Sequence, residues 1–140
     1  MKPVDQKIWD EKRGDCMRAT IASLFEFEIE AVPHFMLLPK GIWQKVLLSF
    51  FRSCGWEYGG VMNYAKDGPN ELKKEDSING YFYASVPSKN FDNTGHAVVM
   101  DMNGVIVHDP HPKKQYQNEN VLETGALQYW YLTTKIERGK

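Results

Sequence analysis

The spacing of hydrophobic positions changes about midway along this chain. In residues 15–27, and again in residues 41–54, apolar side chains recur every three or four positions, as on one face of a helix. We therefore predict two helices, the first with Asp15 as its N-cap and the second followed by Gly55, which suits a helix end. The segment between them, residues 29–39, contains two prolines and is expected to be irregular or a short turn.

After the second helix the pattern changes to short runs rich in β-branched and aromatic residues. These runs predict strands at residues 56–61, 80–86, 96–101, 105–109 and 128–134. Residues 63–79 combine glycine, proline, asparagine and many charges, and we expect a surface loop there. Helices followed by strands predict an α+β fold, an antiparallel sheet covered by helices on one side. No linker or repeat divides the chain, so residues 1–140 are expected to form a single domain.

Composition and charge narrow the possible partners and the compartment. With 140 residues, 42% of them hydrophobic, the chain can fold without metal or disulfide crosslinks, which leaves its cysteines available for chemistry. A net charge of -1 provides no excess of Lys and Arg, so we expect neither nucleic acid nor a membrane surface as partner. Residues 1–10 lack the apolar run of a signal peptide. We expect a cytoplasmic protein with reduced thiols, and no particular oligomeric state is indicated.

Cys16 is the candidate nucleophile. The sequence Gly14-Asp15-Cys16 places this thiol in the first turn of the first predicted helix, where backbone N–H groups and the helix dipole favour the reactive thiolate. The carboxylate of Asp15 opposes that effect. The alternative interpretation of Cys16 is a small buried apolar side chain. Cys54 lies at the far end of the second predicted helix, where the dipole disfavours a thiolate, and we interpret it as a core residue.

A predicted β-hairpin brings a base and a carboxylate together. Asn103-Gly104 is a strong signal for a two-residue hairpin loop. With those residues as the loop, the ladder sets Val98 opposite Asp109. His96 then lies diagonal to Asp109 on the same face, within reach of one hydrogen bond. Such a bond would fix the tautomer of His96 and leave its other nitrogen for a thiol proton.

These residues predict a catalytic triad with Cys16 as nucleophile, His96 as base and Asp109 orienting the base. His108 is expected to face the other side of the sheet as a packed or surface residue. His111 follows the predicted ladder and is a candidate for contact with substrate. The same Cys, His and Asp side chains are also of the types that bind zinc, but no closely spaced ligand pair occurs among them. We therefore predict no metal and no cofactor.

The order of these residues resembles that of the papain-like cysteine peptidase superfamily, in which a Cys at the start of an N-terminal helix precedes a sheet that carries His and then Asp. More narrowly, three segments are similar to small phage and prophage proteins related to the bacteriocin-leader peptidase branch, and the similarity spans most of the chain. The segments read GDCMRA at residues 14–19, HAVV at residues 96–99 and HDPHP at residues 108–112.

This resemblance implies a papain-like fold and an oxyanion hole formed by a Gln side chain together with the backbone N–H of the Cys. Gln6 is the only Gln upstream of Cys16, so the resemblance assigns the role to Gln6. The spacing of ten residues, from 6 to 16, is longer than usual in the family, so residues 7–13 would have to fold back as a loop.

The expected function is that of a cysteine-dependent hydrolase, a peptidase, isopeptidase or amidase, acting on a peptide or protein. Transfer or deamidation on the same site is equally compatible with these residues. The alternative is a catalytically silent papain-fold protein of a phage that binds a host protein, a role that four Trp and seven Tyr would suit. A phage-encoded chain would act in the host cytosol.

Overall fold

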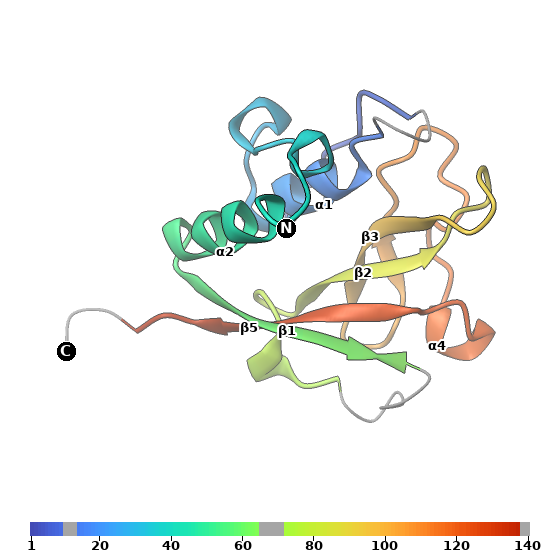
Figure 1. The fold of residues 1–140 in the computed structure, drawn as a ribbon. Coiled ribbons are helices and arrows are strands. Elements are labelled where there is room, and N and C mark those ends of the chain that lie inside the picture. The colour runs from blue at the N-terminus through green and yellow to red at the C-terminus, as the bar shows by residue number, and fades with distance from the viewer. Residues whose placement is uncertain (10–13, 65–71, 138–140) are drawn as a thin grey trace.

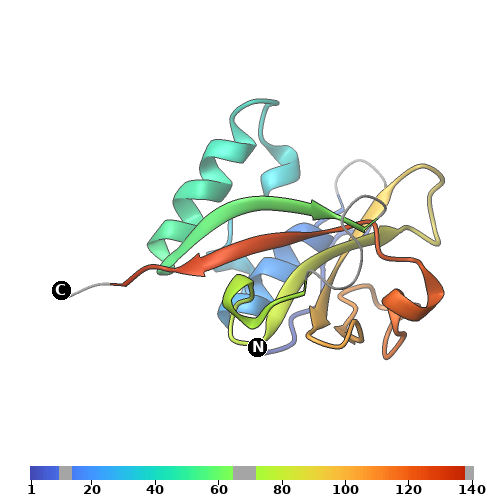
Figure 2. The ribbon, with the colours of Figure 1, turned by 90° about the horizontal axis from the view of Figure 1, so that it is seen from below.

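Five antiparallel strands form one sheet in the computed structural model, which describes residues 1–9, 14–64 and 72–137. The sheet order is β1-β5-β2-β3-β4, so the last strand in the chain lies between the first and the second (Figure 1). Figure 2 shows β1 and β5 side by side. The strands are β1 (Trp56–Asn63), β2 (Tyr81–Pro87), β3 (Gly95–Asp101), β4 (Ile106–His108) and β5 (Tyr129–Lys135).

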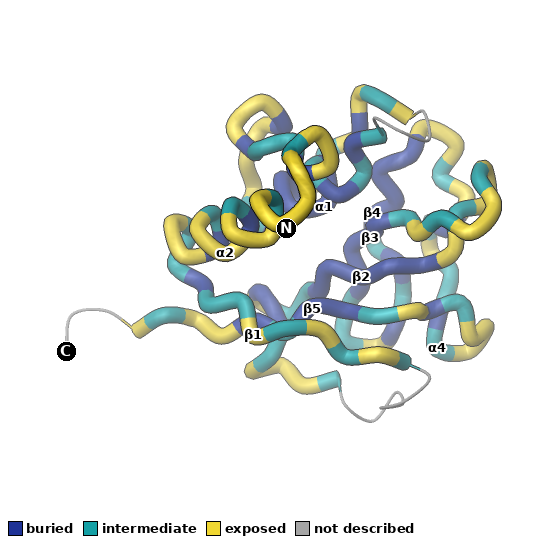
Figure 3. The backbone as a smooth tube through the Cα atoms, viewed as in Figure 1, coloured by how far each residue is buried: buried dark blue, intermediate teal, exposed yellow. Residues whose placement is uncertain are grey.

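Two helices, α1 (Cys16–Phe25) and α2 (Trp43–Ser53), cover one face of this sheet (Figure 1). Most of α1 is buried, and its alanines and serine allow close packing on β3, whereas α2 leaves one side in solvent (Figure 3). Short 3₁₀ turns, η1 (Ile29–Ala31) and η2 (Phe35–Leu37), connect the two helices. The helix-before-sheet order and the covered face confirm the predicted α+β class.

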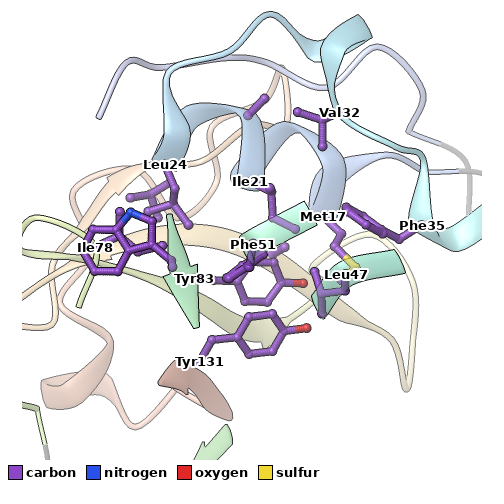
Figure 4. Close-up of a cluster of buried hydrophobic side chains, with 14 residues drawn as sticks. Met17, Ile21, Leu24, Val32, Phe35, Leu47, Phe51, Ile78, Tyr83 and Tyr131 are labelled. Carbon is purple, nitrogen blue, oxygen red and sulfur yellow. The ribbon is translucent and has the colours of Figure 1, made fainter. Parts of the chain in front are cut away.

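The sheet is buried on both faces because its strands alternate large apolar side chains between two cores. Tyr83 and Val99 point into the core beneath α1 and α2, shown in Figure 4. Phe82 and Met100 point the other way, into a second core built around the buried Trp130. The four-residue helix α4 (Val121–Thr124) covers part of this second core, on the opposite side of the molecule from α2 (Figures 1 and 2).

We expect Phe51→Ala in α2 to lower the free energy of unfolding by about 3–5 kcal/mol, because truncation leaves a cavity in a close-packed core. The Phe51 ring is fully buried and makes edge-on contacts with Phe25 and Tyr58, at centroid distances of 5.1 and 5.9 Å. Urea unfolding measures the loss. The matched control is Leu48→Ala in the same helix, where a 42% exposed side chain should change stability by less than about 1 kcal/mol.

The structure corrects the predicted surface loop at residues 63–79 and adds an element that was not predicted. Residues 65–71 of that loop lie outside the described residues. Its later part forms a 3₁₀ turn, η4 (Lys74–Asp76), and the apolar side chain of Ile78 is buried in the first core. Helix α4 was missed, although Asn120 accepts from two N–H groups of its first turn and Gly125 ends it with a positive φ. Asn followed three residues later by Glu is a capping pattern that could have indicated α4.

The hairpin between β3 and β4 differs from the prediction in its loop. The N–H of Asp101 donates to Val105 O at 3.0 Å, so three residues, 102–104, form the loop rather than Asn103-Gly104 alone. The carboxylate of Asp101 favours this longer loop because it accepts the N–H groups of both Asn103 and Val105, at 2.8 and 3.0 Å. Gly104 takes a φ of 83°, which suits its place in such a loop.

A β-bulge compensates for the extra loop residue. Met100 pairs with Ile106, one position off the predicted ladder, but the register shifts at the next step so that Val99 pairs with His108. The second pair belongs to the predicted register. The end of the hairpin that carries His96 and Asp109 therefore has the predicted alignment, although the hairpin loop is one residue longer than predicted.

Candidate active site

Three separate elements bring Cys16, His96 and Asp109 together. Cys16 is the first residue of α1, His96 is the second residue of β3, and Asp109 directly follows β4. The Nε2 of His96 lies 2.7 Å from Oδ1 of Asp109. The Cys16 side chain lies close enough to the imidazole to raise its pKa, and Nδ1 is the ring nitrogen that the bond to Asp109 leaves for it.

The interaction between His96 and Asp109 favours the charged form of the His96 imidazole. Burial lowers the pKa of His96, but the hydrogen bonds to Asp109 and Cys16 outweigh it and raise this pKa from 6.5 to about 9. Burial also raises the pKa of Asp109, but the bond to His96 and two backbone N–H bonds bring it below its ordinary value. At neutral pH the site therefore holds an imidazolium beside a carboxylate.

The Asp109 carboxylate is held from several sides, which fixes its orientation toward His96. Its Oδ1 also accepts the N–H of His111, and its Oδ2 accepts the N–H of Tyr116, both at 3.0 Å. Its own N–H donates to Oε1 of Gln117 at 2.8 Å. Only 1% of the Asp109 side chain is exposed. Tyr116 and Gln117 were not identified from the sequence, since they act through a turn that has no local signature.

A cavity of about 340 Å³ opens beside the thiol and the imidazole. Both Cys16 and His96 lie on its wall, as do Gln6 and His111, so four of the predicted site residues share one cavity. Asp109 is not on the wall, because it lies behind His96. The arrangement gives a small molecule or peptide segment access to the sulfur while the carboxylate stays out of water.

The N-terminal segment folds back onto the start of α1, as the placement of Gln6 requires. The Oδ1 of Asp15 accepts the N–H groups of Lys7 and Ile8 at 3.0 and 2.9 Å, and the N–H of Asp15 donates to Ile8 O. Asp15 is fully buried. Asp15 is the N-cap residue of α1, as predicted, but its carboxylate makes no capping hydrogen bond with the first turn and binds this distant backbone instead. Residues 10–13 of the returning loop lie outside the described residues.

Gln6 is held in place by its backbone and by its side chain. Its N–H donates to Pro110 O at 3.0 Å, just after Asp109 in the chain. Its Nε2 donates to Ile8 O at 2.8 Å, which fixes the plane of the amide and leaves the second N–H of that nitrogen. Among the described residues, its buried Oε1 has no hydrogen-bond partner.

His108 and His111, the two other histidines considered for the site, have different surroundings. His108 is not on the cavity wall: its Nε2 donates to Val4 O at 2.8 Å, and burial lowers its pKa. His111 is on the wall, with its ring centroid 6.2 Å from that of His96. Burial, followed by the charge of His96, lowers the pKa of His111.

Both cysteines are free thiols. Cys54 is only partly buried, but it packs against the core beneath the helices, and burial raises the pKa of its thiol. Within residues 1–9, 14–64 and 72–137, no cluster of three His, Cys, Asp or Glu side chains is arranged to hold a metal ion. In the same ranges, no helix has the length and apolar character needed to cross a bilayer.

No protein-family model matches the chain, and neither does any curated protein sequence or solved structure. The functional interpretation therefore depends on the α+β fold and on the geometry of this site.

Proposed function

We propose that this chain is a cysteine-dependent hydrolase of papain-like type that cleaves an amide bond of a peptide or protein. The observation that carries the proposal is the placement of His96 between Asp109, at 2.7 Å from Nε2, and the Cys16 thiol on the wall of a cavity. A base held between a carboxylate and a thiol is the arrangement that nucleophilic catalysis by cysteine requires.

The proposed reaction has two steps. The Cys16 thiolate attacks the substrate carbonyl carbon, a C–S bond forms, and the amide C–N bond breaks as His96 Nδ1 gives its proton to the leaving amine. Water then attacks the thioester while His96 takes a proton from it. The C–S bond breaks, and the products are a carboxylic acid and the regenerated thiolate. The same steps serve a peptide bond, an isopeptide bond or a side-chain amide, and an amine in place of water would give transfer.

Gln6 and the backbone N–H of Cys16 are the proposed donors to the oxyanion that forms in each step. The amide of Gln6 lies on the same cavity wall as Cys16 and keeps one N–H beyond its bond to Ile8 O. The N–H of Cys16 belongs to the first turn of α1, where such groups have no acceptor within the helix. His111, on the same wall, is proposed to contact the substrate.

A binding protein without turnover is the second candidate, and the exposed apolar residues near the cavity favour it. Trp9, Met36, Leu37 and Ile42 are each about half exposed, between 49% and 56%. In this alternative the chain is a phage protein that docks on a host protein through that surface, and Cys16 is not activated. Either protein would act in the cytoplasm.

Iodoacetamide labelling near pH 6 tests the hydrolase proposal, because iodoacetamide alkylates the thiolate form of a cysteine, which is the form that the proposed reaction needs. We expect Cys16 to be alkylated at least tenfold faster than Cys54, whose raised pKa makes it an internal reference. His96→Ala should bring the rate at Cys16 down to that of Cys54. Peptide mapping by mass spectrometry measures both rates.

The matched control is His108→Gln, because His108 lies off the cavity wall and a glutamine amide can still donate to Val4 O. This variant should label as the wild type does. Equal and slow labelling of both cysteines in the wild-type protein would instead favour the binding protein.

A further inference from the structure

The chain just before Gln6 is bonded to the segment that carries Asp109. The Nε2 of His108 donates to Val4 O at 2.8 Å, and the N–H of Gln6 donates to Pro110 O at 3.0 Å. These two bonds join the N-terminal segment to the residues on either side of the carboxylate that orients the base. The proposed oxyanion donor and that carboxylate therefore belong to one connected structure.

Lys114 adds a third contact between the same two segments. Its Nζ forms an ion pair with the carboxylate of Asp5, the residue directly before Gln6, and donates to the backbone carbonyl oxygen of Asp109 at 2.8 Å. One ammonium group thus binds the N-terminal segment and a residue of the triad at the same time. Lys114 is not among the described residues of the cavity wall, so it can affect a reaction there only through the groups that it holds.

The backbone of Lys114 has an uncommon conformation for a lysine. Its φ is 49°, in the left-handed region that glycine and asparagine adopt more readily than other residues. A turn holds this conformation, because the N–H of Lys114 donates to His111 O at 3.0 Å and its carbonyl oxygen accepts the N–H of Gln117 at 3.2 Å. A lysine here costs free energy that asparagine would not, which indicates that the ammonium group has a use.

The contacts of Lys114 are local ones. The side chains of Lys114 and Asp5 are 35% and 57% exposed, and an ion pair so open to solvent contributes little to the stability of the whole fold. Without Lys114, the carboxylate of Asp15 still holds the next part of the N-terminal segment against α1. Loss of the ammonium should therefore loosen the segment beside Asp109 without unfolding the protein.

We propose that Lys114 is a positioning residue for the oxyanion hole, because its ammonium group holds the segment that carries Gln6 against Asp109. The amide donor and the base then keep a constant separation across the cavity. This inference rests on the proposed hydrolase function and adds to it a residue that touches neither the substrate nor the reacting atoms. A displacement of about 1 Å at a catalytic group can lower a rate by about 10²-fold, so a small loosening is enough to matter.

Lys114→Met tests the proposal with two reactions of the same thiol. Hydrolysis of the p-nitrophenyl ester of N-acetylphenylalanine passes through an oxyanion, whereas alkylation of Cys16 by iodoacetamide does not. We expect ester hydrolysis to fall about five- to twentyfold and alkylation to change by less than about threefold. Lys114→Arg keeps the charge and the donors, and it should recover most of the lost ester hydrolysis.

The matched control is Lys113→Met, which removes an exposed lysine one position earlier in the same turn. The charges of Lys113 and Lys114 both lower the pKa of His111, so comparison of the two variants cancels that effect. Lys113→Met should hydrolyse the ester at the wild-type rate. Equal losses in the two variants would show that the effect comes from general charge, and would overturn the inference.

Lys114→Asn distinguishes positioning from stability. Asparagine adopts a positive φ more readily than methionine, so Lys114→Asn should unfold at a higher temperature than Lys114→Met, although both variants lack the ammonium group. We expect the same loss of ester hydrolysis in both. If Lys114→Asn hydrolysed the ester as the wild type does, the ammonium group would have no positioning role.

Hydrogen exchange at the Gln6 N–H, measured by NMR, reports on the segment without any reaction. This N–H bonds to Pro110 O, whereas the N–H of Val4 bonds to Ser23 Oγ in α1 at 2.9 Å and serves as the internal reference. In Lys114→Met we expect exchange at Gln6 to be at least about fivefold faster and exchange at Val4 to be unchanged. Unchanged exchange at Gln6 would overturn the inference.

The wild-type protein separates the two possible failures. If it labels rapidly at Cys16 and hydrolyses the ester, but Lys114→Met loses no ester hydrolysis, the role of Lys114 alone is rejected. Slow labelling of Cys16 in the wild type would reject the hydrolase function, and the positioning role of Lys114 with it.

Discussion

Replacement of Asp109 by asparagine is expected to lower kcat/KM for an amide substrate by about 10²–10⁴-fold at neutral pH. The carboxylate raises the pKa of His96 against the opposing effect of burial. Without it, the effect of burial is less opposed, the pKa of His96 falls, and a smaller fraction of the imidazole is charged at neutral pH. Asparagine has nearly the same shape, so the main change is the loss of charge.

The direction in which Asp109→Asn changes the pKa of His96 can be measured from the pH dependence of turnover. In the wild-type protein, turnover should fall as the pH rises through about 9, where His96 loses the proton that the leaving amine needs. In Asp109→Asn that fall should move to lower pH. The stability contributed by the charged His96 follows the same sign: it is fully present below about 6.5 and is lost as the pH rises through about 9.

Asp92→Asn provides the control for this substitution. Asp92 is an exposed carboxylate in the loop between β2 and β3, outside the cavity wall, and its removal should leave both the rate and the pH profile unchanged. If Asp109→Asn shifted neither the profile nor the rate while the protein stayed folded by circular dichroism, Asp109 would have no part in orienting or charging His96.

Asp15→Ala is expected to lower hydrolysis of an activated ester, the p-nitrophenyl ester of N-acetylphenylalanine, by about 10²-fold, the loss typical of a missing oxyanion donor. Asp15 acts as a positioning residue, because its Oδ1 holds the N–H groups of Lys7 and Ile8 and so keeps the segment that carries Gln6 against α1. Alkylation of Cys16 by iodoacetamide forms no oxyanion and should change by less than about threefold.

Comparing the loss of ester hydrolysis with the change in alkylation rate distinguishes a positioning role of Asp15 from a general loss of stability. A loss of stability alone would slow ester hydrolysis and alkylation together. Asp15→Asn should restore much of the ester activity, because an amide oxygen can accept the same two N–H groups. Equal losses in both reactions for Asp15→Ala would contradict the role that we assign to this carboxylate.

The pairing of His96 with Asp109 could be predicted because it depends on local features of one hairpin. Alternation along β3 and the Asn103-Gly104 signal were enough to align the two side chains. The loop itself was predicted wrongly, since the bonds from Asp101 that favour three residues depend on side-chain geometry that a dipeptide signal does not contain. The predicted alignment of His96 with Asp109 is nevertheless correct, because the bulge in β4 restores the register.

The position of Gln6 could not be derived in the same way. It depends on a buried carboxylate that bonds backbone groups seven and eight residues away, and on a backbone bond from Gln6 to Pro110. Neither contact corresponds to a periodic pattern of residues in the sequence. The apolar cavity wall was missed for a related reason: Trp9, Met36, Trp43, Tyr83 and Tyr131 come from five separate segments, and each residue alone is typical of an ordinary core.

The position of β5 has a consequence for the order in which the protein matures on the ribosome. The chain emerges from its N-terminus, so the thiol, the imidazole and the carboxylate are all synthesised before residues 129–135. Until β5 inserts, β1 has no partner in the sheet, and the cavity lacks the surface that Tyr131 provides. Closing a loop of more than sixty residues between β1 and β5 is a late and slow event. We therefore expect the part of the cavity wall that Tyr131 provides to form only after β5 has taken its place in the sheet.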